Sequence, residues 1–225
     1  MLPFAALARV DTAIGSMSSS GMPPRPTTTS YALLGLLAVR RWTTYELAKQ
    51  VQRSLGWFWP RTERKLYDEP RRLVEAGLAT ATEERTGNRP RTVYAITPAG
   101  RRALRRWLGE PSQPPALEFE AMIRVFFADG GTLDQLRATL EQVVRAADER
   151  HATLRAMIAG HTAVGDDATD EFAARRHVNA LALRFQLDHE RQQATWARWA
   201  IEQVATWTSA TDPGPWDWRA ALAQP

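Results

Sequence analysis

The residues of this chain that could do chemistry are cations, and they gather in two neighbouring segments. Residues 60–76 read PRTERKLYDEPRRLVEA, and on a helical wheel the apolar Leu66, Pro70 and Leu73 share one narrow arc. The opposite arc is mostly cationic and holds Arg61, Arg64, Lys65, Asp68, Arg71, Arg72 and Glu75. Such a helix can pack through one face and offer the other to phosphates.

A second basic segment follows this helix. Gly77 can end the helix, and two alternating runs, residues 78–84 and 91–97, flank the turn-forming stretch RTGNRP. The pattern predicts a β-hairpin whose basic tip carries Arg85, Asn88, Arg89 and Arg91. A basic helix followed by a basic hairpin is typical of a winged helix-turn-helix, in which the helix enters a major groove and the hairpin reaches the adjacent backbone.

Two helices are predicted before the basic helix, and they must position it. An apolar block in residues 28–40 predicts a helix that is buried almost all round. Thr43 and Glu46 then form a capping box of the S/T-x-x-E type, which predicts a second helix ending near Leu55. This second helix would be the first member of the helix-turn-helix pair, and the aromatic stretch LGWFWP would lead into the basic helix.

The limits of the winged domain follow from composition. Residues 1–27 are rich in Ser, Pro and Gly, and we expect a disordered tail there. Thr97 followed by Pro98 predicts the start of a basic helix over residues 98–108, and a Pro-rich linker near 111–116 comes after it. The predicted DNA-binding domain therefore spans residues 28–110.

The rest of the chain is predicted to be helical. A short helix over 117–128 precedes two long ones, over 132–159 and 167–207. The first has a nearly heptad seam, and the second is apolar on more than one side, so a helical hairpin alone cannot cover it and a second copy can. The residues expected at this dimer contact are Leu140, Leu154, Leu181, Phe185 and Trp196. The fold class is mainly α, with a dimerisation and effector domain over 117–208 and a mobile tail over 209–225.

Charge is segregated along the chain. Residues 28–110 hold 16 Lys and Arg against 8 Asp and Glu, a net charge of +8, whereas residues 111–225 hold 11 against 16, a net charge of −5. A cationic half attracts phosphates and the acidic half does not, which favours nucleic acid over a generally adhesive surface. The absence of Cys and of an apolar run near the ~20 residues that cross a bilayer leads us to expect a cytoplasmic protein.

Catalysis is not expected. The sequence has no G-x-S-x-G, no phosphate-binding loop and no H-E-x-x-H. The histidines have neither a partner four residues away nor a neighbouring Cys, so we expect no metal site; they are His151, His161, His177 and His189. We therefore predict no catalytic, metal-binding or cofactor-binding residue.

Three collinear segments carry a family resemblance: LLGLLAVRRWTTYELAKQV, FWPRTERKLYDEPRRLVEAGLA and NRPRTVYAITPAGRRAL. In order and spacing, residues 28–110 resemble the PadR-like transcriptional regulators. The C-terminal half is similar to the helical dimerisation region of the subgroup related to virulence-gene activators, mainly in helix order and Trp placement.

The resemblance implies a homodimer that places two winged domains on a pseudo-palindromic, double-stranded DNA site. In many members of the family an aromatic or drug-like small molecule relieves repression, so we expect a repressor of this kind. Carried over position by position, the expected DNA contacts are Thr43, Arg61, Thr62, Arg64, Lys65, Tyr67, Arg71, Arg85, Asn88, Arg89 and Arg91.

The sequence leaves two questions open. Trp57 and Trp59 are either core and turn-fixing aromatics or, with Trp196 and Trp199, the lining of a cavity at the dimer centre that accepts a flat ligand. As for function, one alternative is a regulator without an effector. The other is a protein-interaction adaptor whose winged domain no longer reads DNA.

Overall fold

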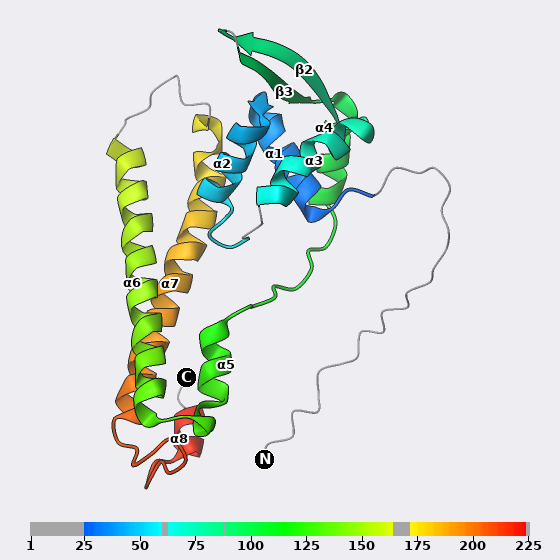
Figure 1. Ribbon diagram of the computed structural model, residues 1–225. Helices are drawn as coiled ribbons and strands as arrows, with labels where there is room; N and C mark the ends of the chain where they lie inside the picture. Colours follow the sequence, from blue (N-terminus) through cyan, green and yellow to red (C-terminus); the bar gives the residue numbers. More distant parts are fainter. Residues whose placement is uncertain (1–24, 60–62, 88, 164–171, 224–225) are drawn as a thin grey trace, which may run out of the picture.

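A computed structural model describes residues 25–59, 63–87, 89–163 and 172–223. A winged domain lies beside one end of a long helical hairpin, and an extended segment runs from this domain towards the hairpin's other end (Figure 1). The elements in chain order are α1 (Thr28–Val39), β1 (Trp42–Thr43), α2 (Thr44–Ser54), α3 (Glu63–Glu75), β2 (Ala79–Thr86), β3 (Arg89–Ile96), α4 (Pro98–Leu108), α5 (Glu120–Phe126), η1 (Ala128–Gly130), α6 (Leu133–Ala163), η2 (Ala173–Arg175), α7 (Arg176–Val204) and α8 (Trp218–Ala223). The predicted fold class is confirmed.

The core of the winged domain is built around α1. Leu33 and Leu34 of this helix are fully buried, as is Leu47 of α2 and Leu66 of α3. Complete burial of one leucine stabilises a fold by about 1.5–3 kcal/mol, so this cluster is large enough to fix the three helices against one another. The prediction that residues 28–40 form a nearly all-buried helix is confirmed over Thr28–Val39.

The sheet has three strands in the order β1-β3-β2, all antiparallel. The hairpin of β2 and β3 was predicted, and it turns at Gly87, whose φ of 60° a glycine adopts without steric cost. The two-residue strand β1 was not predicted, because Trp42 and Thr43 are too few to show an alternating pattern. Trp42 lies opposite Tyr94 of β3 and is itself buried.

Two helix starts that were predicted from the sequence are confirmed. The hydroxyl of Thr43 accepts a hydrogen bond from the backbone N–H of Glu46 at 3.2 Å, which starts α2. The hydroxyl of Thr97 accepts one from the N–H of Gly100 at 3.0 Å, which starts α4. α1 is capped in the same way by Thr27. Each cap satisfies backbone donors that a helix leaves unpaired at its first turn.

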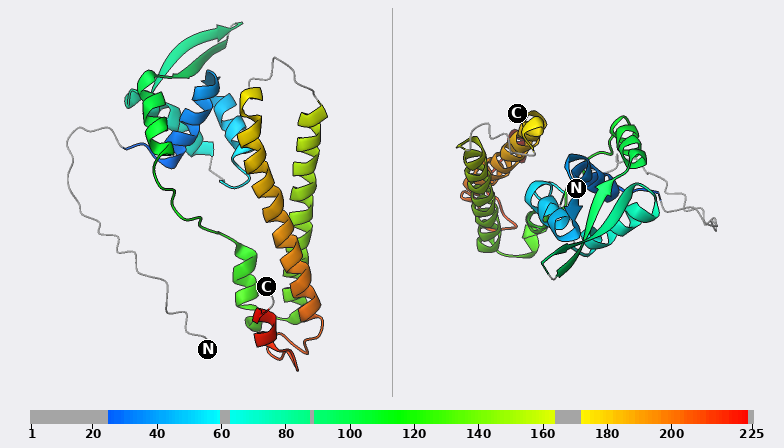
Figure 2. Two further views of the ribbon diagram at one scale, coloured as in Figure 1. Left: turned by 180° about the vertical axis from the view of Figure 1, so that it is seen from behind. Right: turned by 90° about the horizontal axis from the view of Figure 1, so that it is seen from above.

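The C-terminal half is an antiparallel pair of long helices, α6 and α7, which lie side by side in both views of Figure 2. Leu136 and Leu140 of α6 pack against Ala200 and Val204 of α7, and α5 covers the same end of the pair. The seam predicted along the first long helix is therefore buried inside this chain. Of the helices in the described ranges, none has the length and hydropathy that a membrane span needs.

The C-terminal tail, which we expected to be mobile, is described as far as residue 223. It includes the short helix α8 and packs on the end of α7. The indole N–H of Trp216 donates to Oε1 of Gln203 at 3.0 Å, and its ring lies 5.2 Å from that of Trp207. Trp216 therefore connects the tail to the end of α7, and the mobility of the segment stays a prediction.

Candidate nucleic-acid interface

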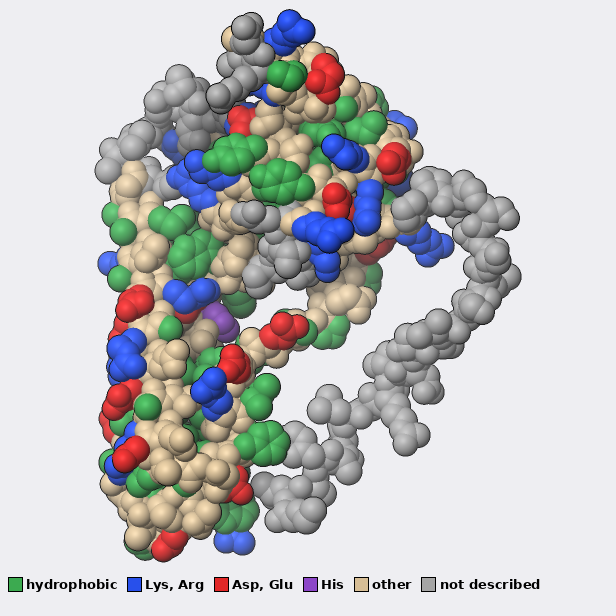
Figure 3. All heavy atoms as spheres, viewed as in Figure 1, with side chains coloured by type: hydrophobic (Ala, Val, Ile, Leu, Met, Phe, Trp, Pro, Cys, Tyr) green, Lys and Arg blue, Asp and Glu red, His purple; other side chains and the backbone are tan. Residues whose placement is uncertain are grey.

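The α3 helix exposes the cationic face that its sequence predicts. Arg64, Lys65 and Arg71 are exposed, and 42% of Tyr67 is accessible to solvent. On this side of the molecule, Lys and Arg side chains are frequent over the winged domain, whereas both signs of charge alternate along the helical hairpin (Figure 3). Arg61 and Thr62, the other two predicted groove residues, lie outside the described residues.

The opposite face of α3 holds the helix in place. Leu66 and Leu73 are buried, and Pro70 lies on the same face as a fully buried member of the core. A buried carboxylate completes this face: the hydroxyl of Ser30 on α1 donates a hydrogen bond to Oε1 of Glu69. The α3 helix runs without interruption through the proline, so the exposed side chains remain on one side.

The C-terminal end of α3 is fixed by a glycine. Gly77 has a φ of 69°, in the left-handed region that residues with a Cβ rarely adopt. The N–H of Leu78 donates to the carbonyl of Leu73 at 2.8 Å, which closes a Schellman-type turn. This turn directs the chain straight into β2, so the basic helix and the wing are rigidly connected.

Thr43, which we expected to contact DNA, has a structural task. Its hydroxyl donates to Oε2 of Glu46 at 2.8 Å and accepts from the Glu46 N–H, so both of its hydrogen-bonding roles serve the capping box. Burial alone would raise the pKa of Glu46, but the hydrogen bonds from Thr43 and the nearby charge of Arg40 outweigh it, and the pKa lies below its ordinary value.

The wing carries less free positive charge than its sequence suggests. Arg91 of β3 donates to Glu84 of β2 at 3.0 Å, and Arg41, which precedes β1, also pairs with Glu84. The hydrogen bond from Arg91 is the largest effect that holds the pKa of Glu84 below its ordinary value. Arg85 is exposed near the turn. Asn88 lies outside the described residues, as does the side chain of Arg89.

Arg41 is a residue that the sequence analysis missed. It stands 43 positions from Glu84, and only the pairing of β1 with β3 brings the two together. The same pairing places this cation at the base of the wing, beside the predicted DNA-contacting hairpin. No local pattern signals it, because β1 is two residues long.

The four arginines of α4 are exposed on the outer side of the winged domain. They are Arg101, Arg102, Arg105 and Arg106. Arg101 donates to the carbonyl of Ala38 at 3.4 Å, whereas Trp107 stacks on Tyr31 of α1 with ring centroids 4.8 Å apart. Trp107 thus docks α4 on α1.

The structure separates the four tryptophans that we grouped as a possible effector site. Trp196 and Trp199 pack in the core of α6 and α7, half-buried, and Trp196 meets Phe119 edge-on at 6.5 Å. Trp57 belongs to the segment between α2 and α3, and its ring is 5.3 Å from the guanidinium of Arg150 on α6. Trp59 is half-buried in the segment that precedes α3.

A cavity of about 320 Å³ lies between α5, α6 and α7. Residues that line it include Phe119, Arg124, Val143, Arg150 and Glu190. Of the described residues around it, none is one of the four tryptophans, but two of those tryptophans contact its walls through Phe119 and Arg150. Its size is at the lower end for small-molecule sites.

The five predicted dimer residues differ in how far this chain buries them, and Trp196 is half-buried in the core of α6 and α7. Leu140 and Leu154 are buried inside the chain, because α7 packs on the seam that they form, so they are not available to a second copy in this arrangement. Leu181 and Phe185 of α7, by contrast, are 73% and 61% exposed.

Comparison with known proteins identifies both halves. Residues 33–106 match the transcriptional regulator PadR-like family, and residues 119–205 match the family named virulence activator alpha C-term. The chain therefore contains a PadR-like domain followed by a domain of the virulence activator alpha C-term family. The PadR-like domain includes α3 and the wing, and the C-terminal match covers α5, α6 and α7. The resemblance that the sequence indicated is confirmed.

Two curated relatives match the PadR-like part. A protein of Mycobacterium tuberculosis described as a probable transcriptional regulator is 36% identical over 85 residues, which cover 37% of this chain and 45% of the relative. The negative transcriptional regulator PadR of Bacillus subtilis is 27% identical over 99 residues, which cover 43% of this chain and 54% of the relative. The chain thus spans about half the length of the curated relatives it matches.

Solved structures share the fold over a larger part of the chain. B. subtilis PadR in complex with operator DNA has a TM-score of 0.68 at 19% identity, and the match covers 79% of this chain and 99% of that one. The Vibrio cholerae virulence activator AphA has a TM-score of 0.62 at 24% identity over 80% of this chain and 99% of its own. B. subtilis PadR has also been solved with p-coumaric acid, with a TM-score of 0.61 at 20% identity over 78% and 98% of the two chains.

Proposed function

We propose that this protein is a dimeric, DNA-binding transcriptional repressor in which each α3 helix enters a major groove. The observation that carries the proposal is the exposed row of Arg64, Lys65 and Arg71, held on a helix whose other face is anchored in the core. Because the backbone of this helix is already held by the core, it needs no further ordering when its cations meet phosphates or base edges. The PadR-like match over residues 33–106 supports the same reading.

The dimer is proposed to form through the helical half. Leu181 and Phe185 leave an apolar strip exposed on α7, and Ile123 and Phe126 of α5 are 60% and 69% exposed. Large apolar side chains that are exposed together on a helix are typical of an interface between subunits. A two-fold dimer would present two α3 helices to half-sites about one helical turn apart, ~34 Å.

An aromatic effector is proposed to bind in the cavity between α5, α6 and α7. Support comes from Phe119, whose ring meets Trp196 at the wall, and from the cations Arg124 and Arg150 in the lining, which favour an acidic ligand. p-Coumaric acid is a suitable first probe, since it combines a flat ring with a carboxylate. Titration of the dimer with it should quench tryptophan emission and weaken DNA binding together; a probe that changes neither quantity would count against this part of the proposal.

The DNA-binding part is tested by footprinting and salt dependence. The wild-type protein should have twice the chain mass of 25.3 kDa in solution and should protect a two-fold-related site upstream of its own gene. The double variant Arg64→Ala, Lys65→Ala should bind that site more weakly. Because the dimer loses two cations in each subunit, the magnitude of the slope of log K against log salt should fall by about 4.

Arg145→Ala is the matched control, because Arg145 is an exposed cation of α6 that pairs with Glu141 on its own helix at 3.6 Å. It should leave the affinity and the salt slope unchanged. If the double variant behaves like this control, α3 does not contact DNA and the adaptor function becomes the better reading.

A further inference from the structure

The covalent connection between the two halves of the chain does not fix their relative orientation. Residues 109–119 join α4 to α5, and they contain no helix or strand. Nearly all of them are exposed. The angle of the winged domain on the helical hairpin must therefore be set by direct contacts between the two parts.

The first such contact centres on Arg150 of α6. Its Nε donates to Oε1 of Glu190 on α7 at 2.9 Å, and Glu190 is only 1% exposed. Gln186, one turn earlier on α7, donates to the same carboxylate oxygen at 2.5 Å. The position of Arg150 is thus fixed by a buried acceptor in the helical core.

The other end of the same guanidinium reaches the winged domain. Nη2 of Arg150 donates to the backbone carbonyl of Trp57 at 3.3 Å, and the guanidinium lies 5.3 Å from the centre of the Trp57 ring. Trp57 lies in the segment between α2 and α3, six residues before the first residue of α3. Arg150 therefore connects the core of the hairpin to the segment that leads into the groove-facing helix.

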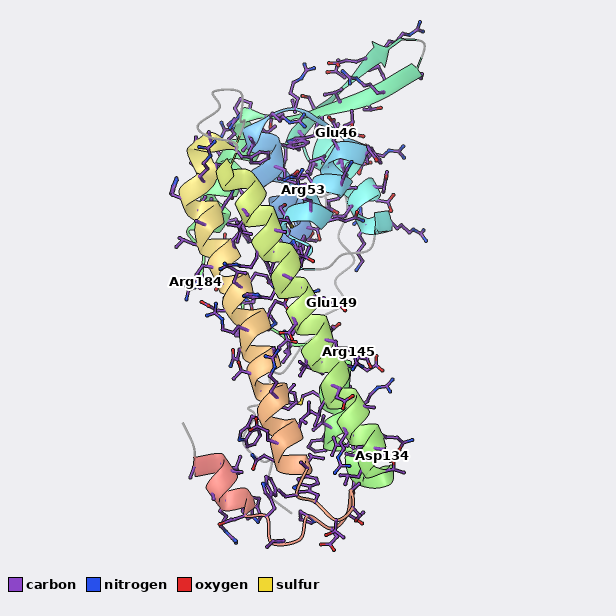
Figure 4. All side chains as sticks on the ribbon, turned by 90° about the vertical axis from the view of Figure 1, so that its left-hand side faces the viewer. Glu46, Arg53, Asp134, Arg145, Glu149 and Arg184 are labelled. Carbon is purple, nitrogen blue, oxygen red and sulfur yellow. The ribbon has the colours of Figure 1, made fainter. Side chains whose placement is uncertain are left out.

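A second contact lies where α7 begins. Phe172, just before η2, packs on the core of the winged domain with its ring 6.2 Å from that of Trp42. Arg175 donates to the carbonyl of Gly35 in α1 at 3.5 Å. The two contacts lie at different heights along the hairpin, since Arg150 is in the middle of α6 and Phe172 precedes α7. In Figure 4, Glu46 and Arg53 mark the winged domain, and Arg145 and Glu149 mark α6.

From this geometry we propose that Arg150 and Phe172 are positioning residues for DNA recognition. By holding the winged domain at two separate points, they fix its angle on the helical hairpin and so determine which half-site spacing a dimer accepts. Neither residue needs to touch DNA for this. The inference rests on the proposed function only in its DNA arm, since the angle itself can be measured without DNA.

The chemistry of Arg150 allows a sharp test. Arg150→Lys keeps a positive charge beside the buried Glu190 but removes the planar fork that also reaches Trp57, so it separates the tie between domains from the ion pair. Phe172→Ala removes the aromatic part of the second contact and leaves no buried charge unpaired. Arg145→Lys is the matched control. It makes the same change from Arg to Lys on α6, at a position whose side chain pairs with Glu141 of the same helix.

The DNA arm uses the site found by footprinting and duplexes with one to five base pairs inserted between its half-sites. Arg150→Lys and Phe172→Ala should each bind the duplex with the native spacing about tenfold more weakly than the wild-type protein does. Their affinity for the altered spacings and for a single half-site should stay within about twofold of the wild-type value. The dependence of affinity on spacing should therefore become weaker. Arg145→Lys should keep the wild-type profile. Unchanged spacing preference in both tested variants would overturn the proposal.

The second arm needs no DNA. Because the chain has no Cys, spin labels at Lys49→Cys in α2 and Ala152→Cys in α6 report one distance between the two parts, with labelled chains diluted in unlabelled ones. The distance distribution should broaden in Phe172→Ala and Arg150→Lys and stay narrow in Arg145→Lys. A narrow distribution in all of them would refute the proposal, even if the protein binds DNA as expected.

The two arms also separate the two proposals. A wild-type protein that protects no DNA would refute the proposed function, whereas the label distances would still decide whether these residues hold the domain. Thermal unfolding of each variant shows whether it is folded at the working temperature. If Arg150→Lys unfolds, Phe172→Ala decides both arms.

Discussion

The hydroxyl of Ser30 donates a hydrogen bond to the carboxylate of Glu69, which joins the first turn of α1 to the middle of α3. Both residues are buried, and Arg72 lies beside Glu69 with 3.7 Å between Nη1 and Oε2. A buried carboxylate that loses a hydrogen-bond donor costs more than the bond itself contributes. This one contact therefore bears on how firmly the proposed groove-facing helix is held.

Ser30→Ala should lower the free energy of unfolding by about 1–3 kcal/mol, because it removes the donor to Glu69 and also half of the capping box with Thr27. Chemical denaturation of the wild-type protein and the variant measures this change in the free energy of unfolding. Thr28→Ala in the same turn is the control, since Thr28 is exposed, and it should cost far less. Equal losses in the two variants would mean that the contact with Glu69 contributes little.

Gly100 in α4 is predicted to tolerate no side chain. A Cβ there would lie 2.1 Å from the carbonyl oxygen of Leu78 and 2.9 Å from Cγ1 of Ile96. Since the first of these is backbone at the start of the wing, Gly100→Ala should move α4 away from the sheet and destabilise the domain by about 1–3 kcal/mol or more.

Gly35→Ala is the matched control for this change. Gly35 lies inside α1, and a Cβ there would meet nothing within 4 Å. Alanine is the better helix former, so this variant should gain about 0.5–1 kcal/mol. Thermal unfolding of the two variants should therefore move in opposite directions. A stable Gly100→Ala protein would show that α4 can shift without cost.

These contacts mark what local sequence could and could not predict. The caps at Thr43 and Thr97 and the buried arc of α3 depend on residues within four positions of one another, so periodicity and capping rules found them. The tie from Arg150 to Trp57 spans 93 positions and exists only because the winged domain docks on the hairpin. Sequence pattern carries no information at that range.

The sequence also could not predict which helix packs on the apolar seam of α6. The spacing of Leu140 and Leu154 shows that something packs on them, but a helix of the same chain and a helix of another copy satisfy that pattern alike. In the structure α7 takes this place, and the exposed residues are Leu181 and Phe185. The sequence likewise left open whether Trp57 shares an aromatic cavity with Trp196, and in this chain Trp57 lies beside Arg150 whereas Trp196 packs in the core of α6 and α7.

The capping carboxylate of Glu46 gives a pH dependence with a definite sign. Its pKa in the folded protein is lowered from the ordinary 4.5, because hydrogen bonds from Thr43 and the charge of Arg40 outweigh the opposing effect of burial. A group with a lowered pKa stabilises the fold above its unfolded pKa, and this contribution is lost as the pH falls through the folded value. The relevant window is therefore below pH 4.5.

Glu46→Gln isolates this contribution, since glutamine can keep the capping geometry without the charge. The wild-type protein should unfold at a higher temperature than the variant at pH 7, and the difference should shrink as the pH is lowered below 4.5. Because the side chain is 39% exposed, solvent screening keeps the difference below about 1 kcal/mol. A difference that grows on acidification would contradict the assignment.

Glu84 is predicted to restrain DNA binding by the wing. It pairs with Arg41 and Arg91, and it lies opposite Arg91 in the third residue pair from the turn of the hairpin. Glu84→Gln should free both guanidiniums for phosphates, so affinity for non-specific duplex should rise several-fold. The salt slope should steepen by about 1 for each additional phosphate that a freed arginine neutralises.

Two variants make this prediction specific to the wing. Glu118→Gln changes the net charge equally but lies in the exposed segment between α4 and α5, so it should alter affinity and salt slope little. Arg85→Ala, at an exposed position near the turn, should weaken binding more than Arg91→Ala, because the charge of Arg91 is already paired with Glu84. Equal losses in these two arginine variants, with no rise in affinity in Glu84→Gln, would show that the pairs open freely on DNA and that the carboxylate exerts no restraint.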